Sequence, residues 1–443
     1  MNTPIHDFLK NYRAQNAIRL HMPGHKGNLM PDDITEIEGA DSLYAPSGII
    51  AESEKNASHL FGAQTIYSTE GASQCIRAMV YLATLYAKAS GKEAHILAGC
   101  NAHRAFLSAV SLCDTRVTFL YGSSKSILAC PLSAETVDAQ LSQGDYTALY
   151  ITSPDYLGNC TDIAALSAVC KKHGVLLLVD NAHGAYFRFL PHRDIPTALG
   201  ADLACSSAHK TLPVLTGGAY LHIGNTAPPL FADEARRAMV LFGSTSPSYL
   251  ILNSLDCANA LLSSPEYLAA LKDLSDKTAA IKKALTEKGF VLTGDEPLKI
   301  TVCPKSYGYT GDAVAAYLAE KNIVSEFHDP DFIVFMVASE TKKAALSALC
   351  DALFALPRKK EITEKPPEIP KCERVLSIRE AAFAPSETVS AKDSVGCVLA
   401  EAGVSCPPAV PIVICGERIH EKAAEAFQYY GITQIQVVKA NAL

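Results

Sequence analysis

Short apolar runs alternate with helical patterns along residues 60–225, and this alternation limits the fold to one class. In the clearest unit, TALYITSPD (147–155) precedes a helical pattern that Asp162 caps and Gly174 ends, and VLLLVD (175–180) follows. A strand that is apolar along its whole length is typical of a parallel sheet with helices on both faces. The sequence therefore predicts an α/β domain with a mostly parallel sheet.

Neighbouring segments extend this pattern. We expect helices over 3–15, 73–90, 102–113 and 249–289, and strands at 95–97 and 117–120. A second pattern, GFVLTG, LKITVC, a helix at 311–321, NIVSEF, FIVFMV and a helix at 340–356, predicts a smaller α+β domain. The predicted division is an arm (1–45), a large domain (46–265), a small domain (266–356), a Pro-rich linker (357–371) and a C-terminal subdomain (372–443).

Charge and cysteine usage exclude several classes of protein. Lys and Arg total 39 against 46 Asp and Glu, a net charge of −7, which argues against nucleic acid as a partner. The 14 cysteines include no CxxC pair, so no zinc site is expected. The N-terminal residues lack a signal-peptide pattern and no apolar run is long enough to span a bilayer. We expect a cytoplasmic protein with reduced thiols.

Polar residues directly after predicted strands are the candidate site residues, because ligands of parallel sheets bind at the carboxyl ends of the strands. Asp180 ends VLLLVD and precedes His183. Lys210 follows a short strand in GADLACSSAHK, together with Ser207 and His209. Alone, Asp180 could equally cap a turn, and Lys210 would more often be a solvated surface lysine.

Two further positions are weaker signals. STEGASQC (68–75) is a turn of small and hydroxyl residues that opens a helix, where backbone N–H groups favour an anion. Turns of this kind are common, and this one matches neither the P-loop nor the GxGxxG pattern. His103 follows another strand, where an isolated histidine is more often a capping group than a catalyst.

Together these residues supply what pyridoxal phosphate requires. The cofactor needs a lysine amine for covalent attachment, a carboxylate at the ring nitrogen and a cradle for its phosphate. Lys210, Asp180 and the Gly71–Ser73 turn with Ser207 meet these needs in that order. The imidazole of His103 is expected to stack on the ring.

Ten ordered motifs cover nearly the whole chain: HMPGHKG (21–27), DDITEIEGADSLYAPSG (32–48), EGAS (70–73), NAHRA (101–105), TSPDYLG (152–158), VDNAHGAYF (179–187), SSAHKTLPVLTGG (206–218), STSPSY (244–249), APSETV (384–389) and CPPAVPIVICGERI (406–419). Through these motifs the chain resembles the Orn/Lys/Arg decarboxylase family, in its shorter form without an N-terminal wing domain. The resemblance implies a fold-type I pyridoxal-phosphate enzyme that decarboxylates arginine, lysine or ornithine, in polyamine biosynthesis.

The resemblance also assigns roles to residues. It makes Lys210 the lysine that bonds to the cofactor, Asp180 the partner of the ring nitrogen, His103 the stacking base and His183 a residue packed at the ring. The residues that it implies around the phosphate or the lysine are Gly71, Ala72, Ser73, Ser207 and His209. It implies a homodimer, possibly part of a larger oligomer, in which Ser244, Thr245 and Ser246 contact the partner's phosphate.

The sequence departs from the family pattern mainly around the substrate. Arg104 replaces a usual lysine, Ala208 replaces a threonine, and Cys406 and Ala409 stand in a C-terminal motif that usually reads YPPGIP. A basic substrate needs an acidic partner, for which Asp41, Asp155 and Glu417 are the candidates, each with a loop-capping alternative. Two rival functions stay open: another fold-type I reaction, such as transamination or elimination, and a non-catalytic paralogue that binds the cofactor.

Overall fold

The computed structural model describes residues 1–122, 126–368, 371–401, 404–406 and 410–442, with only the backbone of 404–406. The chain forms two compact units. Unit 1 contains residues 1–94, 137–153 and 162–273, and unit 2 contains residues 95–136, 154–161 and 274–443. Both units therefore combine segments that are far apart in the sequence, because the chain passes between them several times.

Five strands of one sheet form the centre of unit 1. The order of these five strands is β1-β7-β6-β5-β4. The strands are β1 (Gln64–Ser68), β4 (Ala148–Thr152), β5 (Leu176–Asp180), β6 (Leu203–Ser206) and β7 (Ala219–Ile223). Strands β4, β5 and β6 are parallel, and β7 runs antiparallel to both β6 and β1. Because almost every residue of these strands is buried, the sheet is covered on both faces, as the apolar runs predict.

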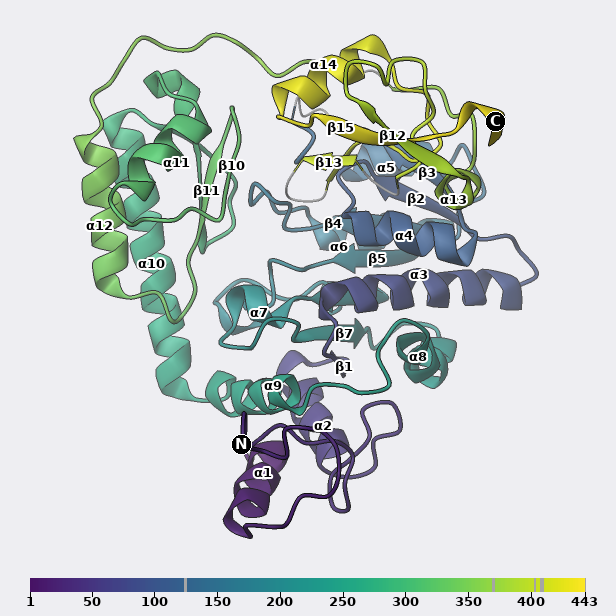
Figure 1. The fold of residues 1–443 in the computed structure, drawn as a ribbon, viewed down its shortest axis with the longest axis vertical. Helices are drawn as coiled ribbons and strands as arrows, with labels where there is room; N and C mark the ends of the chain where they lie inside the picture. Colours follow the sequence, from purple (N-terminus) through teal and green to yellow (C-terminus); the bar gives the residue numbers. More distant parts are fainter. Residues whose placement is uncertain (123–125, 369–370, 402–403, 407–409, 443) are drawn as a thin grey trace. The chain divides into compact units, whose positions relative to one another are not determined.

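Helices cover this sheet. Helix α3 packs on β1, β7, β6 and β5, while α2 packs on β1 and against α1 and α9 (Figure 1). The helices of unit 1 are α1 (Pro4–Ala14), α2 (Ile49–Phe61), α3 (Gly71–Ala89), α6 (Ile163–His173), η1 (Phe187–Phe189), α7 (Ala208–Thr211), α8 (Pro229–Leu241) and α9 (Tyr249–Leu262). Asp162 caps α6 and Gly174 ends it in a left-handed conformation, which confirms both predictions.

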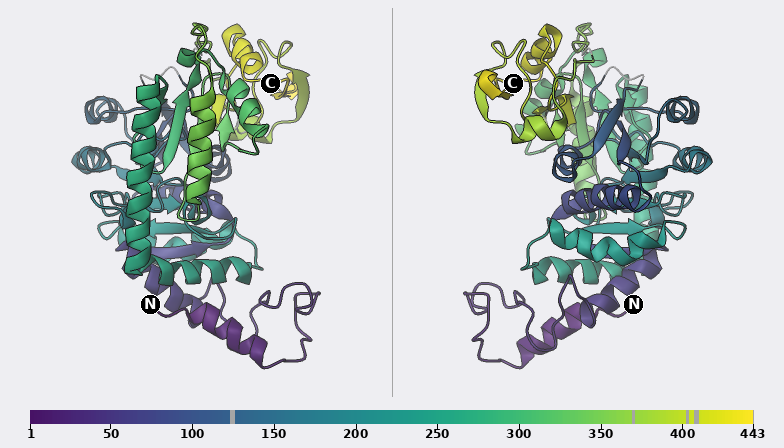
Figure 2. Two further views of the ribbon diagram at one scale, coloured as in Figure 1. Left: turned by 90° about the vertical axis from the view of Figure 1, so that its left-hand side faces the viewer. Right: turned by 90° about the vertical axis from the view of Figure 1, so that its right-hand side faces the viewer.

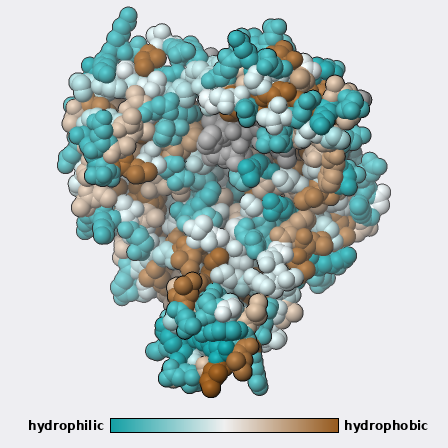
Figure 3. Space-filling model, viewed as in Figure 1, coloured by the Kyte–Doolittle hydropathy of each residue, from teal (hydrophilic) through white to brown (hydrophobic). Residues whose placement is uncertain are grey.

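The loop between α1 and α2 extends away from the helices of unit 1 (Figure 2). Several of its apolar side chains face solvent in the single chain, with Ile18 and Leu20 each 89 % exposed. Figure 3 shows apolar surface at the end of unit 1 that the arm forms. Contiguous apolar surface of this kind is typical of interaction sites.

Unit 2 begins with the parallel strands β2 (His95–Gly99) and β3 (Arg116–Leu120), joined by α4 (Arg104–Cys113). Its second sheet is antiparallel, with strand order β10-β11-β9-β8. The elements of this part are β8 (Val291–Thr293), β9 (Lys299–Cys303), η2 (Pro304–Tyr307), α11 (Gly311–Ala319), β10 (Phe327–His328), β11 (Ile333–Met336) and α12 (Lys343–Ala355). The predicted α+β pattern is therefore present, although NIVSEF forms a strand only from Phe327 onward.

The C-terminal part of unit 2 contains two strand pairs, β12–β15 and β13–β14, both antiparallel. Its elements are α13 (Ile378–Phe383), β12 (Ser386–Ser390), β13 (Val404–Cys406), β14 (Val410–Val413), α14 (Glu421–Tyr429), β15 (Gln434–Val438) and η3 (Ala440–Ala442). Helices α5 (Ala134–Leu141) and α10 (Pro265–Lys288) carry the chain between the units. No helix in the described ranges is both long and apolar enough to cross a membrane.

Candidate active site

Lys210 lies in the short helix α7, directly after strand β6 of unit 1. Its Nζ atom is 3.2 Å from Nε2 of His183, which follows the neighbouring strand β5. Both side chains therefore reach the carboxyl edge of the parallel strands, where the sequence predicts a site. An amine within hydrogen-bond distance of an imidazole can exchange a proton with it, so the pair can act in acid–base chemistry.

Asp180 ends strand β5, and its side chain is almost completely buried. Oδ1 accepts hydrogen bonds from the Ala182 backbone N–H (3.1 Å) and from the Cys205 thiol (3.5 Å). Oδ2 accepts a hydrogen bond from the Tyr150 hydroxyl (3.3 Å). Strands β4 and β6 flank β5, so each neighbouring strand holds one side of the carboxylate.

The two side-chain donors keep their protons. Burial raises the pKa of the Tyr150 hydroxyl and of the Cys205 thiol well above their ordinary values. The nearby Asp180 carboxylate raises both pKa values further. Burial also raises the pKa of Cys75, which lies near Asp180, to about 12. Tyr150, Cys205 and Cys75 are consequently neutral groups around the Asp180 side chain.

The start of helix α3 fits an anion. The N-cap Glu70 makes no side-chain capping bond, so the first N–H groups of the helix have no side-chain acceptor from that position. Gly71 has φ +70° and donates its N–H to the Gly217 carbonyl oxygen (2.7 Å). Thr69 Oγ1 is buried and has no hydrogen-bond partner. A phosphate oxygen could accept hydrogen bonds from the uncapped N–H groups of the first helical turn and from the Thr69 hydroxyl.

Backbone contacts connect this turn to the lysine. The His209 backbone N–H donates to the Gly218 carbonyl oxygen (3.2 Å), next to the residue that Gly71 contacts. Burial is the main cause that lowers the pKa of His209, and the positive charge of Lys210 lowers it further. Of the other predicted cradle residues, Ala72 and Ser207 are buried and Ser73 is half-buried. The structure thus brings the α3 turn and α7 together.

Three predicted residues lie in unit 2. His103 caps helix α4, with Nδ1 accepting the Ala105 N–H (3.1 Å), so the capping alternative describes its local contact. Asp155 accepts hydrogen bonds from the backbone and side chain of Asn159, and burial raises its pKa to about 6. Glu417 accepts the Ile414 N–H and pairs with Arg374 at 3.4 Å. Their roles toward cofactor and substrate stay predictions.

Asp41 shows a structural role in unit 1. Its two carboxylate oxygens accept backbone N–H groups from the loop before helix α2 and from its first turn: Ser42, Ser47, Gly48, Ile50 and Ala51. These hydrogen bonds lower its pKa although burial opposes them. These contacts favour the loop-capping alternative for Asp41 over a contact with the substrate.

Two further predicted segments are Ser244–Ser246 and the C-terminal motif with Cys406 and Ala409. Ser244, Thr245 and Ser246 are exposed in the single chain, where Ser246 N–H donates to the Ser244 hydroxyl (3.2 Å). Exposure is compatible with a contact to a partner subunit, which stays a prediction. The Cys406 backbone pairs with Val410 in the β13–β14 hairpin, and Ala409 lies outside the described residues.

Sequence reasoning missed Tyr150 and Cys205. A weak signal existed for Tyr150, since its hydroxyl belongs to an otherwise apolar strand and a buried hydroxyl needs a partner. Cys205 gave no signal, because its thiol becomes a donor only through the pairing of β5 with β6.

Comparisons with known proteins agree with this geometry. Residues 3–302 match the family model for the Orn/Lys/Arg decarboxylase major domain. The chain is similar to the uncharacterized protein YaaO of Bacillus subtilis (28 % identity; 96 % of this chain and 93 % of that protein). It is also similar to an arginine decarboxylase of B. subtilis (27 %; 95 % and 92 %).

Among solved structures, lysine decarboxylase A from Pseudomonas aeruginosa superposes with a TM-score of 0.80. It covers 98 % of this chain and 80 % of that chain at 18 % identity, which shows a shared fold. The fold is that of the fold-type I pyridoxal-phosphate enzymes, with additional C-terminal domains, as predicted.

Proposed function

The chain belongs to the Orn/Lys/Arg decarboxylase family, and on that premise we propose that it decarboxylates a basic amino acid with pyridoxal phosphate as cofactor. The substrate classes are arginine, lysine and ornithine, and the products are the corresponding amine and CO₂. One observation carries the proposal. The Lys210 and His183 side chains are in contact at the carboxyl ends of the strands, where Asp180 also lies.

The residues of unit 1 fit the cofactor. Lys210 is the group for covalent attachment, and the Asp180 carboxylate is the group for the ring nitrogen. The uncapped start of α3 and the unpartnered Thr69 hydroxyl suit the phosphate. Pyridoxal phosphate, when bound, accepts the electron pair that the departing CO₂ leaves at Cα.

The chain's own residues have distinct tasks in this proposal. Asp180, fixed by Tyr150, Cys205 and the Ala182 N–H, supplies a negative charge in a water-excluded position. An oriented buried charge stabilises developing positive charge more strongly than water does. The His183–Lys210 pair can hold and return the proton that Cα needs after CO₂ leaves. His103 is proposed as the stacking base, and Ser244–Ser246 as contacts to a partner subunit in a homodimer.

Asp155 and Glu417 are the proposed partners of the substrate's cationic end. Asp155 is the better candidate in charge, because a pKa of about 6 leaves it largely ionised at neutral pH. Glu417 is already engaged by Arg374, so a substrate cation would have to compete with that guanidinium.

Product analysis tests the function directly. The cofactor-saturated protein is incubated separately with arginine, lysine and ornithine, and products are identified by mass spectrometry. We expect agmatine, cadaverine or putrescine, and Lys210→Ala should form none. A keto acid would instead indicate transamination. Intact cofactor binding with no product from any amino acid would favour a non-catalytic paralogue.

A further inference from the structure

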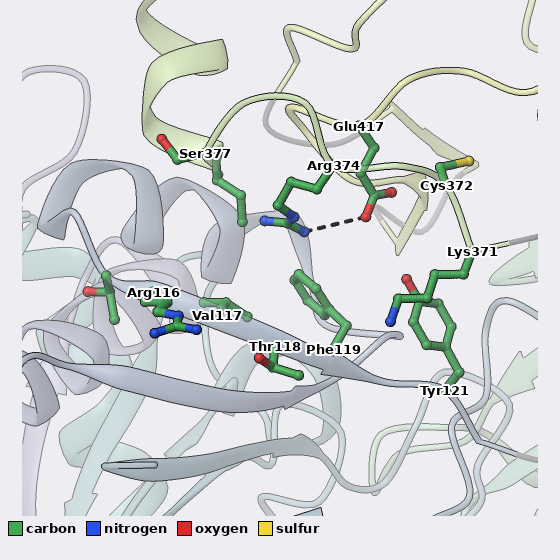
Figure 4. Close-up of a pocket in the computed structure, with 12 residues that line it drawn as sticks. Arg116, Val117, Thr118, Phe119, Tyr121, Lys371, Cys372, Arg374, Ser377 and Glu417 are labelled. Carbon is green, nitrogen blue, oxygen red and sulfur yellow. Dashed lines mark hydrogen bonds and ion pairs between the residues drawn. The ribbon is translucent and has the colours of Figure 1, made fainter. Parts of the chain in front are cut away.

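A cavity of about 400 Å³ lies within unit 2, along strand β3 and beneath the segment that begins at Lys371 (Figure 4). Cavities of this size accommodate small organic ligands. Its floor includes the Phe119 ring, and its upper side includes Arg374 and Glu417. All of these residues belong to one unit, so the cavity is complete within it.

Strand β3 offers an open edge to this cavity. Side chains of adjacent β3 residues, such as Thr118 and Phe119, point to opposite faces of a strand, yet both line the cavity. Lining from both faces is expected only along a strand edge. β3 pairs with β2 on one side and is the last strand of its sheet in the described part of the chain.

The cavity is positively charged although the chain is negative. Three cationic side chains line it, Arg116, Lys371 and Arg374, against one acid, Glu417. Three positive charges and one negative charge give a net charge of +2, in a chain whose formal charge is −7. Within the described ranges, neither Arg116 nor Lys371 forms an ion pair with a carboxylate.

Internal contacts already balance the acid. Glu417 accepts the Ile414 N–H through one oxygen and pairs with Arg374 through the other, at 3.4 Å. The Arg374 guanidinium also lies 5.8 Å from the centre of the Phe119 ring. The Lys371 charge also attracts Glu417, so one acid faces three cationic side chains, and two of them, Arg116 and Lys371, make no ion pair with it.

These two charges lie at opposite ends of the cavity. Figure 4 shows Arg116 at one end of the β3 floor and Lys371 beside Tyr121 at the other, with Phe119 between them. Arg116 and Tyr121 are five residues apart, about 16 Å along an extended chain. Burial raises the pKa of the Tyr121 hydroxyl, which leaves it a neutral donor beside Lys371.

We propose that this cavity binds an elongated organic dianion, with one acidic group at Arg116, the other at Lys371 and Tyr121, and an apolar spacer across Phe119. A single compact anion would reach only one end and would leave the other cation unpaired. The proposal uses none of the residues proposed to hold the cofactor, and it shares with the proposed function only Glu417, here as the partner of Arg374.

Titration calorimetry on the cofactor-saturated full chain tests the proposal, because bound cofactor blocks the phosphate cradle. The probe is suberate, which carries a carboxylate at each end of an apolar chain. Octanoate has nearly the same chain and one carboxylate, and malonate has two carboxylates too close together. We expect saturable suberate binding at one site per chain, weaker at high salt, and clearly weaker binding of octanoate and malonate.

Variants locate the site. Arg116→Gln and Lys371→Gln should each weaken suberate binding about two- to fivefold, and the double variant about tenfold. Lys288→Gln removes an exposed lysine at the end of α10 and should leave affinity unchanged. Thermal unfolding verifies that the variants are folded. Equal affinity of wild type and double variant, equal affinity of suberate and octanoate, or no saturable binding would each overturn the proposal.

Discussion

The Cys205 thiol on strand β6 donates a hydrogen bond to the Asp180 carboxylate on strand β5, with Sγ and Oδ1 3.5 Å apart. Tyr150 on β4 donates to the other oxygen, so the carboxylate is held from both neighbouring strands. These hydrogen bonds fix the orientation of the Asp180 side chain, and a fixed polar group of this kind is what electrostatic stabilisation of a bound ligand requires.

The first prediction concerns the Tyr150 hydroxyl. Tyr150→Phe removes a donor to a buried carboxylate, and we expect the free energy of unfolding to fall by about 1–2 kcal/mol in urea titrations. Tyr220→Phe is the matched control, since the Tyr220 hydroxyl is buried without a hydrogen-bond partner and its loss should not destabilise the protein. Equal effects of the two substitutions would show that the Tyr150 contact contributes nothing.

Asp180→Asn tests the charge itself. The amide keeps the size of the carboxylate, so we expect the cofactor to bind while the rate of amine formation falls at least about 100-fold. Cofactor absorbance and amine release are measured on the same preparation. Asp162→Asn, at the N-cap of α6, should keep the wild-type rate because Asn caps a helix about as well as Asp. A wild-type rate for Asp180→Asn would remove the proposed role of the carboxylate.

A partly buried ion pair lies in unit 1, where the Glu54 side chain is 6 % exposed and the Arg236 side chain 27 %. Arg236 donates hydrogen bonds to both oxygens of Glu54, of which the Nη1–Oε1 contact measures 2.9 Å. Arg236→Met leaves the Glu54 charge buried without a partner, so we expect a loss of about 3 kcal/mol in the free energy of unfolding. Arg237→Met next to it breaks only an exposed pair with Glu234 and should cost less than about 1 kcal/mol. Similar losses for the two variants would contradict this ranking.

The buried carboxyl group of Asp329 should make the free energy of unfolding depend on pH. Burial is the largest cause that raises its pKa to about 7, and Oδ2 has no hydrogen-bond partner. The folded chain therefore holds this proton over a range in which the unfolded chain, with a pKa near 3.8, has released it. The contribution of Asp329 to the free energy of unfolding is therefore largest below about pH 4. It falls as the pH rises to about 7, and above that pH it stays low.

Asp329→Asn should remove this dependence, since an amide does not ionise. We expect the variant to be more stable than wild type at pH 8, and to lose that advantage near pH 4. Urea titrations across this range measure the difference in unfolding free energy. Asp145→Asn is the control at an exposed side chain. Parallel pH profiles for wild type and Asp329→Asn would show that Asp329 ionises normally in the fold.

Local signals in the sequence predicted much of the secondary structure. Asp162 and Gly174 bound helix α6 because an N-cap side chain and a left-handed glycine act within one turn of the chain. NIVSEF was predicted as a strand from its apolar residues, yet Val324 is 90 % exposed and only Phe327 onward pairs with β11. Its local pattern did not reveal that Phe327 is the one residue of NIVSEF that belongs to the β10–β11 pairing.

The sequence by itself determined which residues bring an amine, a carboxylate and an imidazole to the ends of the strands: Lys210, Asp180 and His183. Tertiary structure alone decided their surroundings. Strand β7 lies antiparallel between β6 and β1, which brings Gly217 to Gly71, and β4 and β6 flank β5, which brings Tyr150 and Cys205 to Asp180. These pairings join residues 25 to 146 positions apart, and strand pairing over such distances depends on the packing of the whole sheet, which leaves no local pattern in the sequence.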